Sequence, residues 1–322
     1  MNRSFGRALA LLGGLALVAL PLGCLVPNVR TDAPALPVAE RDAYRLLGGE
    51  ARSLAGCRYD YRVYEPSRAA GAGTADTVTV ALGHGFLRDQ DTLVGLARAL
   101  ANAGHRALTL DFCNMRPWNG HHVRNGADLR ALAERVADGP IVYGGFSAGA
   151  LAAVLAASGE GADAHAANAP ESARADEAGE GHGDLASDAS GGRGDAPPTL
   201  GVVTLDLVDQ ADLAANAVRG LDDVPLVGLQ GPPSGCNAFG NGRVAFQRHP
   251  RSRLDTLAGA SHCEFESPTD ALCETFCGDE DADAEDERTR ALIVERVLEA
   301  IDELASDHAA ARPMPPGGAA RM

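Results

Sequence analysis

The stretch IVYGGFSAGALAAVLAA, residues 141 to 157, changes character at its centre. It begins as an apolar, β-branched run typical of a buried strand and ends as an alanine-rich run typical of a helix. Ser147 stands at the change, between Gly145 and Gly149. We interpret the stretch as a strand, a sharp turn that exposes the serine hydroxyl, and a helix whose N-terminal amides and dipole point at the same spot.

Strand and helix signals alternate on both sides of this turn. Strand-like runs are YDYRVYEP, TVTVALGHG, HRALTLDF, GVVTLDLV, VPLVGLQG and RSRLDTLAG. Helix-like runs are DQDTLVGLARALANAG, GADLRALAERVADG and a final segment near 286–306. Such alternation predicts an α/β fold with a mostly parallel sheet and helices on both faces. We expect one domain, residues 51–306.

Two segments lack the composition of a packed domain. Residues 158–199 are rich in glycine, alanine and acidic residues and have hardly any large apolar side chain. Such a segment buries too little surface to offset its ordering entropy, so we interpret it as a disordered insertion within the domain. The tail, residues 307–322, is interpreted in the same way.

The N-terminus has the layout of a secretory signal peptide over residues 1–23, with Arg3 and Arg7 before an apolar run. A transmembrane helix is the second choice, because a proline interrupts that run. Residues 24–50 are rich in proline and alanine and predict a tether. The junction at Cys24 resembles a bacterial lipoprotein signal, so a lipid on Cys24 would join the protein to a membrane. We expect export, to the cell envelope or the medium.

Charge and cysteine content limit the partners. The formal net charge of -16 argues against nucleic acid as a partner. Six of the seven cysteines remain if Cys24 carries lipid, and an even number in an exported chain predicts up to three disulfides. Cys273 and Cys277 are poor partners for each other if they share a helix. No CxxC pair occurs, so a zinc site is not expected.

A serine becomes a nucleophile when a base takes its proton and a carboxylate orients that base. His262 is the candidate base, because it follows the last strand in LAGASHCEFE and comes after Ser147 in the chain. Asp206, where the run GVVTLDLV ends, is the candidate acid. Asp209 is the alternative acid, and its other interpretation is the N-cap of the next helix.

The run ALGHGF predicts a loop whose backbone approaches a developing oxyanion. The N–H groups of Phe86 and Ala148 are the candidate oxyanion-hole donors, and His84 is expected to shape the loop. Phe146 and Trp118 are candidate pocket residues, although Trp118 has ordinary loop packing as an equal alternative. The pair of histidines at 121 and 122 has no evident third ligand, so we expect no metal and no cofactor.

Three stretches carry a family resemblance: HGFLRDQDTLVGLARALANAGHRALTLDF, GVVTLDLVD and GASHCEFE. With them the chain resembles the α/β-hydrolase superfamily from about residue 57 to 300, in the branch of chlorophyllase-like, dienelactone-hydrolase-like and polyester-hydrolase-like enzymes. The resemblance implies that Asp206 is the triad acid. It does not imply chlorophyll as substrate, because the turn reads GFSAG instead of GHSRG, and Leu207 replaces a proline.

These residues together predict an exported serine hydrolase that cleaves carboxylic esters of small molecules through an acyl-enzyme on Ser147. We expect an open site that prefers short or medium acyl chains, because no apolar lid segment is evident. A polyester or cutin-type hydrolase is a sharper alternative. A lipoprotein that keeps the fold but only binds a ligand or partner is the alternative from another class.

Overall fold

The computed structural model describes residues 44–53, 56–67, 77–113, 120–160, 196–278 and 284–311. Its strands are β1 (Tyr44–Arg52), β2 (Arg58–Pro66), β3 (Thr79–Gly83), β4 (Arg106–Leu110), β5 (Ile141–Phe146), β6 (Thr199–Leu205), β7 (Leu226–Gln230) and β8 (Ser252–Thr256). Its α-helices are α2 (Val94–Asn102), α3 (His122–Val136), α4 (Ala148–Ser158), α7 (Leu213–Ala217), α8 (Arg243–Arg248), α9 (Ala271–Cys277) and α10 (Ala284–Ala311). Short 3₁₀ turns are η2 (Gln90–Leu93), η4 (Val218–Gly220) and η5 (His262–Phe265).

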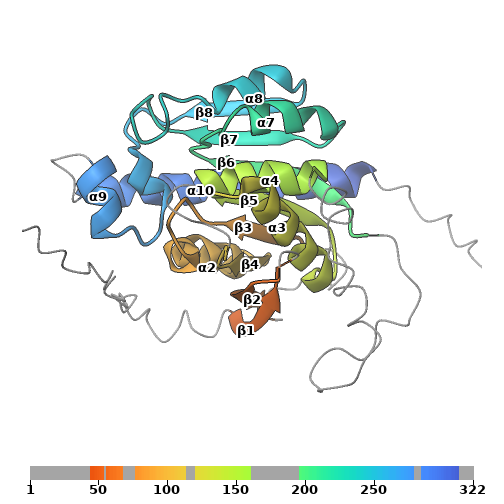
Figure 1. The fold of residues 1–322 in the computed structure, drawn as a ribbon. Helices are drawn as coiled ribbons and strands as arrows, with labels where there is room; N and C mark the ends of the chain where they lie inside the picture. The colour runs from red at the N-terminus through yellow and green to blue at the C-terminus, as the bar shows by residue number, and fades with distance from the viewer. Residues whose placement is uncertain are drawn as a thin grey trace, which may run out of the picture. The chain divides into compact units, whose positions relative to one another are not determined.

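The strands form one eight-stranded sheet in the order β1-β2-β4-β3-β5-β6-β7-β8 (Figure 1). β1 and β2 pair antiparallel, as do β2 and β4, and every other pairing is parallel. The predicted α/β class and mostly parallel sheet are therefore confirmed. The carboxyl ends of β3, β5, β6 and β8 lie at one edge of the sheet. The candidate site residues lie in the loops that follow these four strands.

Two hydrophobic cores lie on the two faces of this sheet. Residues of α3, α4, α7 and α8 pack on one face, and residues of α2 and α10 pack on the other. Strand β5 contributes side chains to both cores. Ile141 and Tyr143 belong to the first core and Val142 to the second, because successive side chains of a strand point to opposite faces of the sheet. Helix α4 is buried along almost its whole length, which explains why its sequence is apolar on every side.

Three predicted boundaries are wrong. The predicted insertion, residues 158–199, includes Ser158, the last residue of α4, and Thr199, the first residue of β6. Residues 44–50 were assigned to the tether, but they belong to β1, which begins at Tyr44 and pairs along its length with β2. β1 is an edge strand with mostly exposed residues, so it lacks the apolar alternation that identifies a buried strand. The domain also extends past residue 306, because α10 continues to Ala311. Its last turns contain alanines, which favour a helix without core contacts.

Several sequence predictions fall on residues outside the described ranges: the signal peptide, most of the tether, Cys24, Trp118, residues 161–195 of the insertion and residues 312–322 of the tail. Among the helices of the described ranges, none combines the length and the apolarity needed to cross a bilayer.

Candidate active site

The turn after β5 holds Ser147 in an unusual backbone conformation. Its φ of 55° and ψ of -115° lie outside the regions that residues with a side chain normally occupy. The flanking glycines are needed because the chain is crowded here. A Cβ on Gly149 would lie 2.0 Å from the carbonyl oxygen of Gly83, and one on Gly145 would lie 2.5 Å from the carbonyl oxygen of Gly149. The GxSxG pattern thus allows the end of β3 and the start of α4 to meet beneath the serine.

Asp206 and His262 come together from two different strand ends. Asp206 follows β6, is fully buried, and has its Oδ2 atom 2.6 Å from Nδ1 of His262. Its Oδ1 atom accepts hydrogen bonds from the backbone N–H of Gly231, at 3.1 Å, and from Nδ2 of Asn237, at 3.2 Å. With Nδ1–H donating to the carboxylate, Nε2 of His262 is left as the acceptor, which is the tautomer that a general base needs.

Asp209, the alternative acid, has another task. Its two carboxylate oxygens accept hydrogen bonds from the backbone N–H groups of Ala214 and Ala215 at 2.8 and 3.1 Å. These amides belong to the first turn of α7 and have no partner within the helix, so Asp209 supplies one. The N-cap position itself is held by Asp212, so the N-cap interpretation of Asp209 is wrong in position, although its carboxylate binds the start of the helix. The structure brings Asp206, and not Asp209, to the histidine.

A cavity of about 620 Å³ opens at this edge of the sheet. Five of the predicted site residues line it: Phe86, Phe146, Ser147, Ala148 and His262. Asp206 does not line the cavity but contacts it through His262, and the ring of Phe146 packs against the ring of His262 with ring centroids 4.6 Å apart. The cavity is within the ~300–1,000 Å³ typical of small-molecule sites.

The loop after β3 is held by the buried His84. Its Nδ1 atom donates to the carbonyl oxygen of Gly85 at 2.8 Å, and its Nε2 atom accepts from the backbone N–H of Phe112 at 2.9 Å. Burial lowers the pKa of His84, so the ring is neutral in this arrangement. Both ring nitrogens are occupied by the backbone, which gives His84 the loop-shaping position that the sequence predicted.

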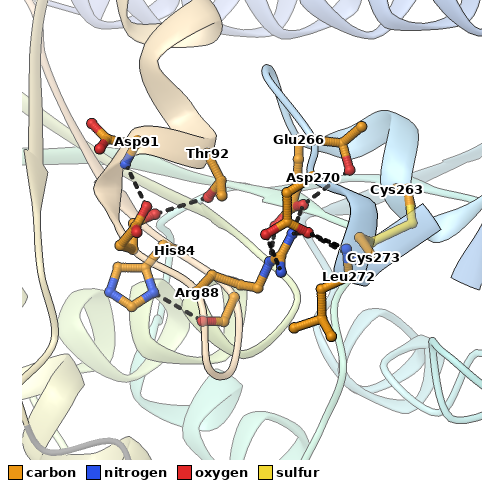
Figure 2. A network of polar contacts seen from close by, with 12 residues as sticks. His84, Arg88, Asp91, Thr92, Cys263, Glu266, Asp270, Leu272 and Cys273 are labelled. Atoms are coloured by element: carbon orange, nitrogen blue, oxygen red, sulfur yellow. Dashed lines mark hydrogen bonds and ion pairs between the residues drawn. A yellow bond between two sulfur atoms is a disulfide. The ribbon is translucent and has the colours of Figure 1, made fainter. Parts of the chain in front are cut away.

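Arg88 ties this loop to the segment that carries the histidine (Figure 2). Its guanidinium makes a two-pronged pair with the fully buried Glu266, at 2.7 and 2.5 Å, and a second with Asp270, at 2.8 and 3.1 Å. Burial alone would lower the pKa of Arg88, but the two carboxylates outweigh it and the pKa is raised. Sequence reasoning missed Arg88, because a charged residue in a surface-like loop gave no sign of burial.

Helix α9 forms part of the cavity wall and is anchored by two disulfides. Cys273 bonds to Cys263, next to His262, and Cys277 bonds to Cys236, next to Asn237. A third disulfide joins Cys57 to Cys113. The predicted limit of three disulfides is confirmed, as is the prediction that Cys273 and Cys277 do not pair with each other.

The two neighbouring histidines, His121 and His122, lie at the start of α3. His122 lines the cavity, and burial lowers its pKa. Within the described ranges, no group of three or more His, Cys, Asp or Glu side chains is placed to hold a metal ion.

No protein-family model matches the sequence, and no curated protein sequence matches it. Solved structures do resemble it. The brefeldin A esterase described as a bacterial homologue of human hormone sensitive lipase is 13% identical, with a TM-score of 0.53, over 87% of this chain and 81% of its own. The peroxisomal α/β-hydrolase Lpx1 from Saccharomyces cerevisiae is 10% identical, with a TM-score of 0.52, over 85% and 92%. Vibralactone cyclase is 13% identical, with a TM-score of 0.50, over 83% and 81%.

The chain has the α/β-hydrolase fold. Identities this low show the fold alone, so these structures confirm the predicted fold. The candidate residues Ser147, Asp206 and His262 occur along the chain in the order nucleophile, acid, histidine that is predicted for a triad on this fold.

Proposed function

We propose that this α/β-hydrolase-fold protein is a serine hydrolase that cleaves carboxylic esters of small molecules. One observation carries the proposal: His262, at 2.6 Å from the buried Asp206, lines the same cavity as the strained Ser147. A binding protein without chemistry has no need of a buried carboxylate paired with a histidine at the mouth of a serine turn.

The reaction proceeds in two halves. Oγ of Ser147 attacks the ester carbonyl carbon, and its proton passes to Nε2 of His262. The N–H groups of Phe86 and Ala148 donate to the oxyanion that forms. The tetrahedral intermediate collapses, His262 protonates the leaving alcohol, and the acyl group stays on Ser147. Water then attacks the acyl carbonyl carbon while one of its protons passes to Nε2 of His262. The second tetrahedral intermediate collapses, the bond to Oγ breaks, and His262 returns the proton to Oγ of Ser147 as the carboxylic acid leaves.

Asp206 acts on the histidine throughout. Its carboxylate holds the ring in the tautomer with Nδ1 protonated and stabilises the imidazolium that forms during each half-reaction. Gly231 and Asn237 donate to its other oxygen, so the carboxylate cannot rotate away from His262 without losing two hydrogen bonds.

The test is turnover of p-nitrophenyl butyrate by the purified domain, with a Ser147→Ala variant as control. We expect the natural protein to hydrolyse the ester and the variant to show no hydrolysis above background. We also expect a fluorophosphonate to label Ser147 of the natural protein. Full activity in the Ser147→Ala variant would show that another group is the nucleophile. Absence of turnover with any short ester, together with saturable ligand binding, would favour the binding lipoprotein instead.

We also propose that the chain is exported. Six cysteines joined in three disulfides are typical of an oxidising compartment and support the signal-like N-terminal sequence. Lipid attachment at Cys24 is part of this proposal, and mass spectrometry of the mature N-terminus from the producing cell tests it.

A further inference from the structure

Large apolar side chains gather at the mouth of the cavity. In the described part of the chain, eight large hydrophobic residues are exposed, and four of them line this one cavity: Phe86, Leu87, Leu272 and Phe276. Exposed apolar groups that cluster instead of scattering mark a binding groove. Two of the four, Leu272 and Phe276, lie on α9.

Helix α9 presents two rows of side chains. Leu272 and Phe276 are four residues apart, and so are Cys273 and Cys277, so each pair lies along one side of the helix. All four line the cavity. The cysteine row is bonded to the rest of the domain, whereas the apolar row is largely open to solvent: Leu272 is 52% exposed and Phe276 is 74% exposed.

The helix has seven residues, too few to be stable by itself. Three links join it to the rest of the domain: the two disulfides and the ion pair between Asp270 and Arg88. Asp270 accepts hydrogen bonds from the N–H groups of Leu272 and Cys273 at its first turn, and the two disulfides fix its middle and its end. Asp270 also pairs with Arg88 of the loop after β3, as Figure 2 shows.

Each attachment leads to a part of the candidate machinery. Cys263 is the neighbour of His262, Cys236 is the neighbour of Asn237, and Arg88 is two residues from Phe86. The helix is therefore fixed relative to the base, to the residue that supports the acid, and to the oxyanion loop. A movable lid would need the opposite, a segment with few such links.

We propose that α9 is a fixed apolar wall of the substrate site, on which Leu272 and Phe276 bind the hydrocarbon chain of the ester. The proposal rests on the proposed function and gives its substrate class: esters whose apolar acyl chain is long enough to contact both side chains. The wall is present before substrate arrives, so binding needs no lipid interface to expose it. Because a disulfide lies next to each of these two residues, at Cys273 and at Cys277, the surface that binds the hydrocarbon chain keeps a fixed position relative to Ser147.

The experiment compares two substitutions with matched controls. Leu272→Ala is paired with Leu46→Ala, on the edge strand β1, because Leu46 is equally exposed at 54%. Phe276→Ala is paired with Phe239→Ala, because Phe239 is 77% exposed and does not line the cavity. KM and kcat are measured for p-nitrophenyl acetate and p-nitrophenyl octanoate.

Removing part of an apolar pocket costs about tenfold or more in discrimination. We expect each wall variant to raise KM for the octanoate about tenfold and to leave the acetate within about twofold, whereas both controls match the natural sequence. Equal losses on both esters, or equal losses in the controls, would overturn the proposal.

A second measurement separates the wall from the catalytic proposal. The Ser147→Ala variant, which should not turn over ester, is titrated calorimetrically with p-nitrophenyl octanoate, alone and combined with each wall variant. We expect Kd to rise about tenfold in the combined variants. If the natural protein hydrolyses no ester but Kd rises in the combined variants, the proposed function is wrong and the proposed wall is supported. If esters are hydrolysed but neither KM nor Kd changes, the wall fails and the function stands.

Discussion

Replacement of Arg88 by methionine should destabilise the domain strongly, because it leaves a buried charge without its partner. The Arg88 side chain is 8% exposed and that of Glu266 is fully buried. Removing one member of a buried ion pair costs about 3–5 kcal/mol of unfolding free energy. The second pair, with Asp270, adds little to this figure because the Asp270 side chain is 43% exposed. We therefore expect a loss of about 3–5 kcal/mol at pH 7.

The loss should shrink as the pH falls. Burial raises the pKa of the Glu266 carboxyl, and Arg88 opposes that shift. Without Arg88, the folded-state pKa rises further above the unfolded value. A raised carboxyl pKa destabilises the folded state fully at pH values above it, and this penalty disappears once the carboxyl is protonated in both states. The difference between the variant and the natural sequence should therefore decrease from pH 7 towards about pH 4.5, near the ordinary pKa of glutamate.

Urea unfolding at both pH values measures this difference. The double variant Arg88→Met/Glu266→Gln should recover most of the loss, and together with the single variant Glu266→Gln it completes a double-mutant cycle. Arg58→Met is the control, because Arg58 pairs with Glu50 at the surface, where both side chains are more than half exposed. It should cost no more than about 1 kcal/mol. A loss below about 1 kcal/mol for Arg88→Met at pH 7, or the same loss at both pH values, would refute the reasoning.

Three further outcomes are expected. Asp206→Asn should lower kcat for p-nitrophenyl butyrate about 10⁴-fold, because an amide favours the wrong tautomer of His262; a loss below about tenfold would contradict this role. Gly149→Ala should cost about 3 kcal/mol in urea unfolding, the upper end of the usual cost of overpacking, because its Cβ would meet a backbone carbonyl 2.0 Å away. Gly259→Ala, with open space around its Cβ, should stay within about 0.5 kcal/mol. Thiol titration of the mature protein, denatured without reductant, should find no more than one free thiol; most of the six reacting would argue against export.

The sequence by itself determined the parts of this protein that depend on local pattern. In buried strands and helices the apolar residues recur at a regular spacing that a short stretch of sequence already shows, so the parallel sheet was predictable. The placement of Ser147 and His262 at one cavity was predictable because each follows a strand, and the carboxyl ends of parallel strands share one edge of the sheet. The edge strand β1 was missed, since an exposed strand has no such pattern.

Only the tertiary structure decided between residues with the same local pattern. Asp206 and Asp209 stand three residues apart in one loop, and the distance to His262 distinguishes them, because Asp209 spends both oxygens on α7. Other contacts also join segments that are far apart in the chain. The disulfides pair distant cysteines, Arg88 is buried against Glu266, and the apolar row of α9 lines the same cavity as Ser147. Contacts of this kind depend on how the strand ends and loops are arranged in three dimensions, and a single sequence carries no local signal for them.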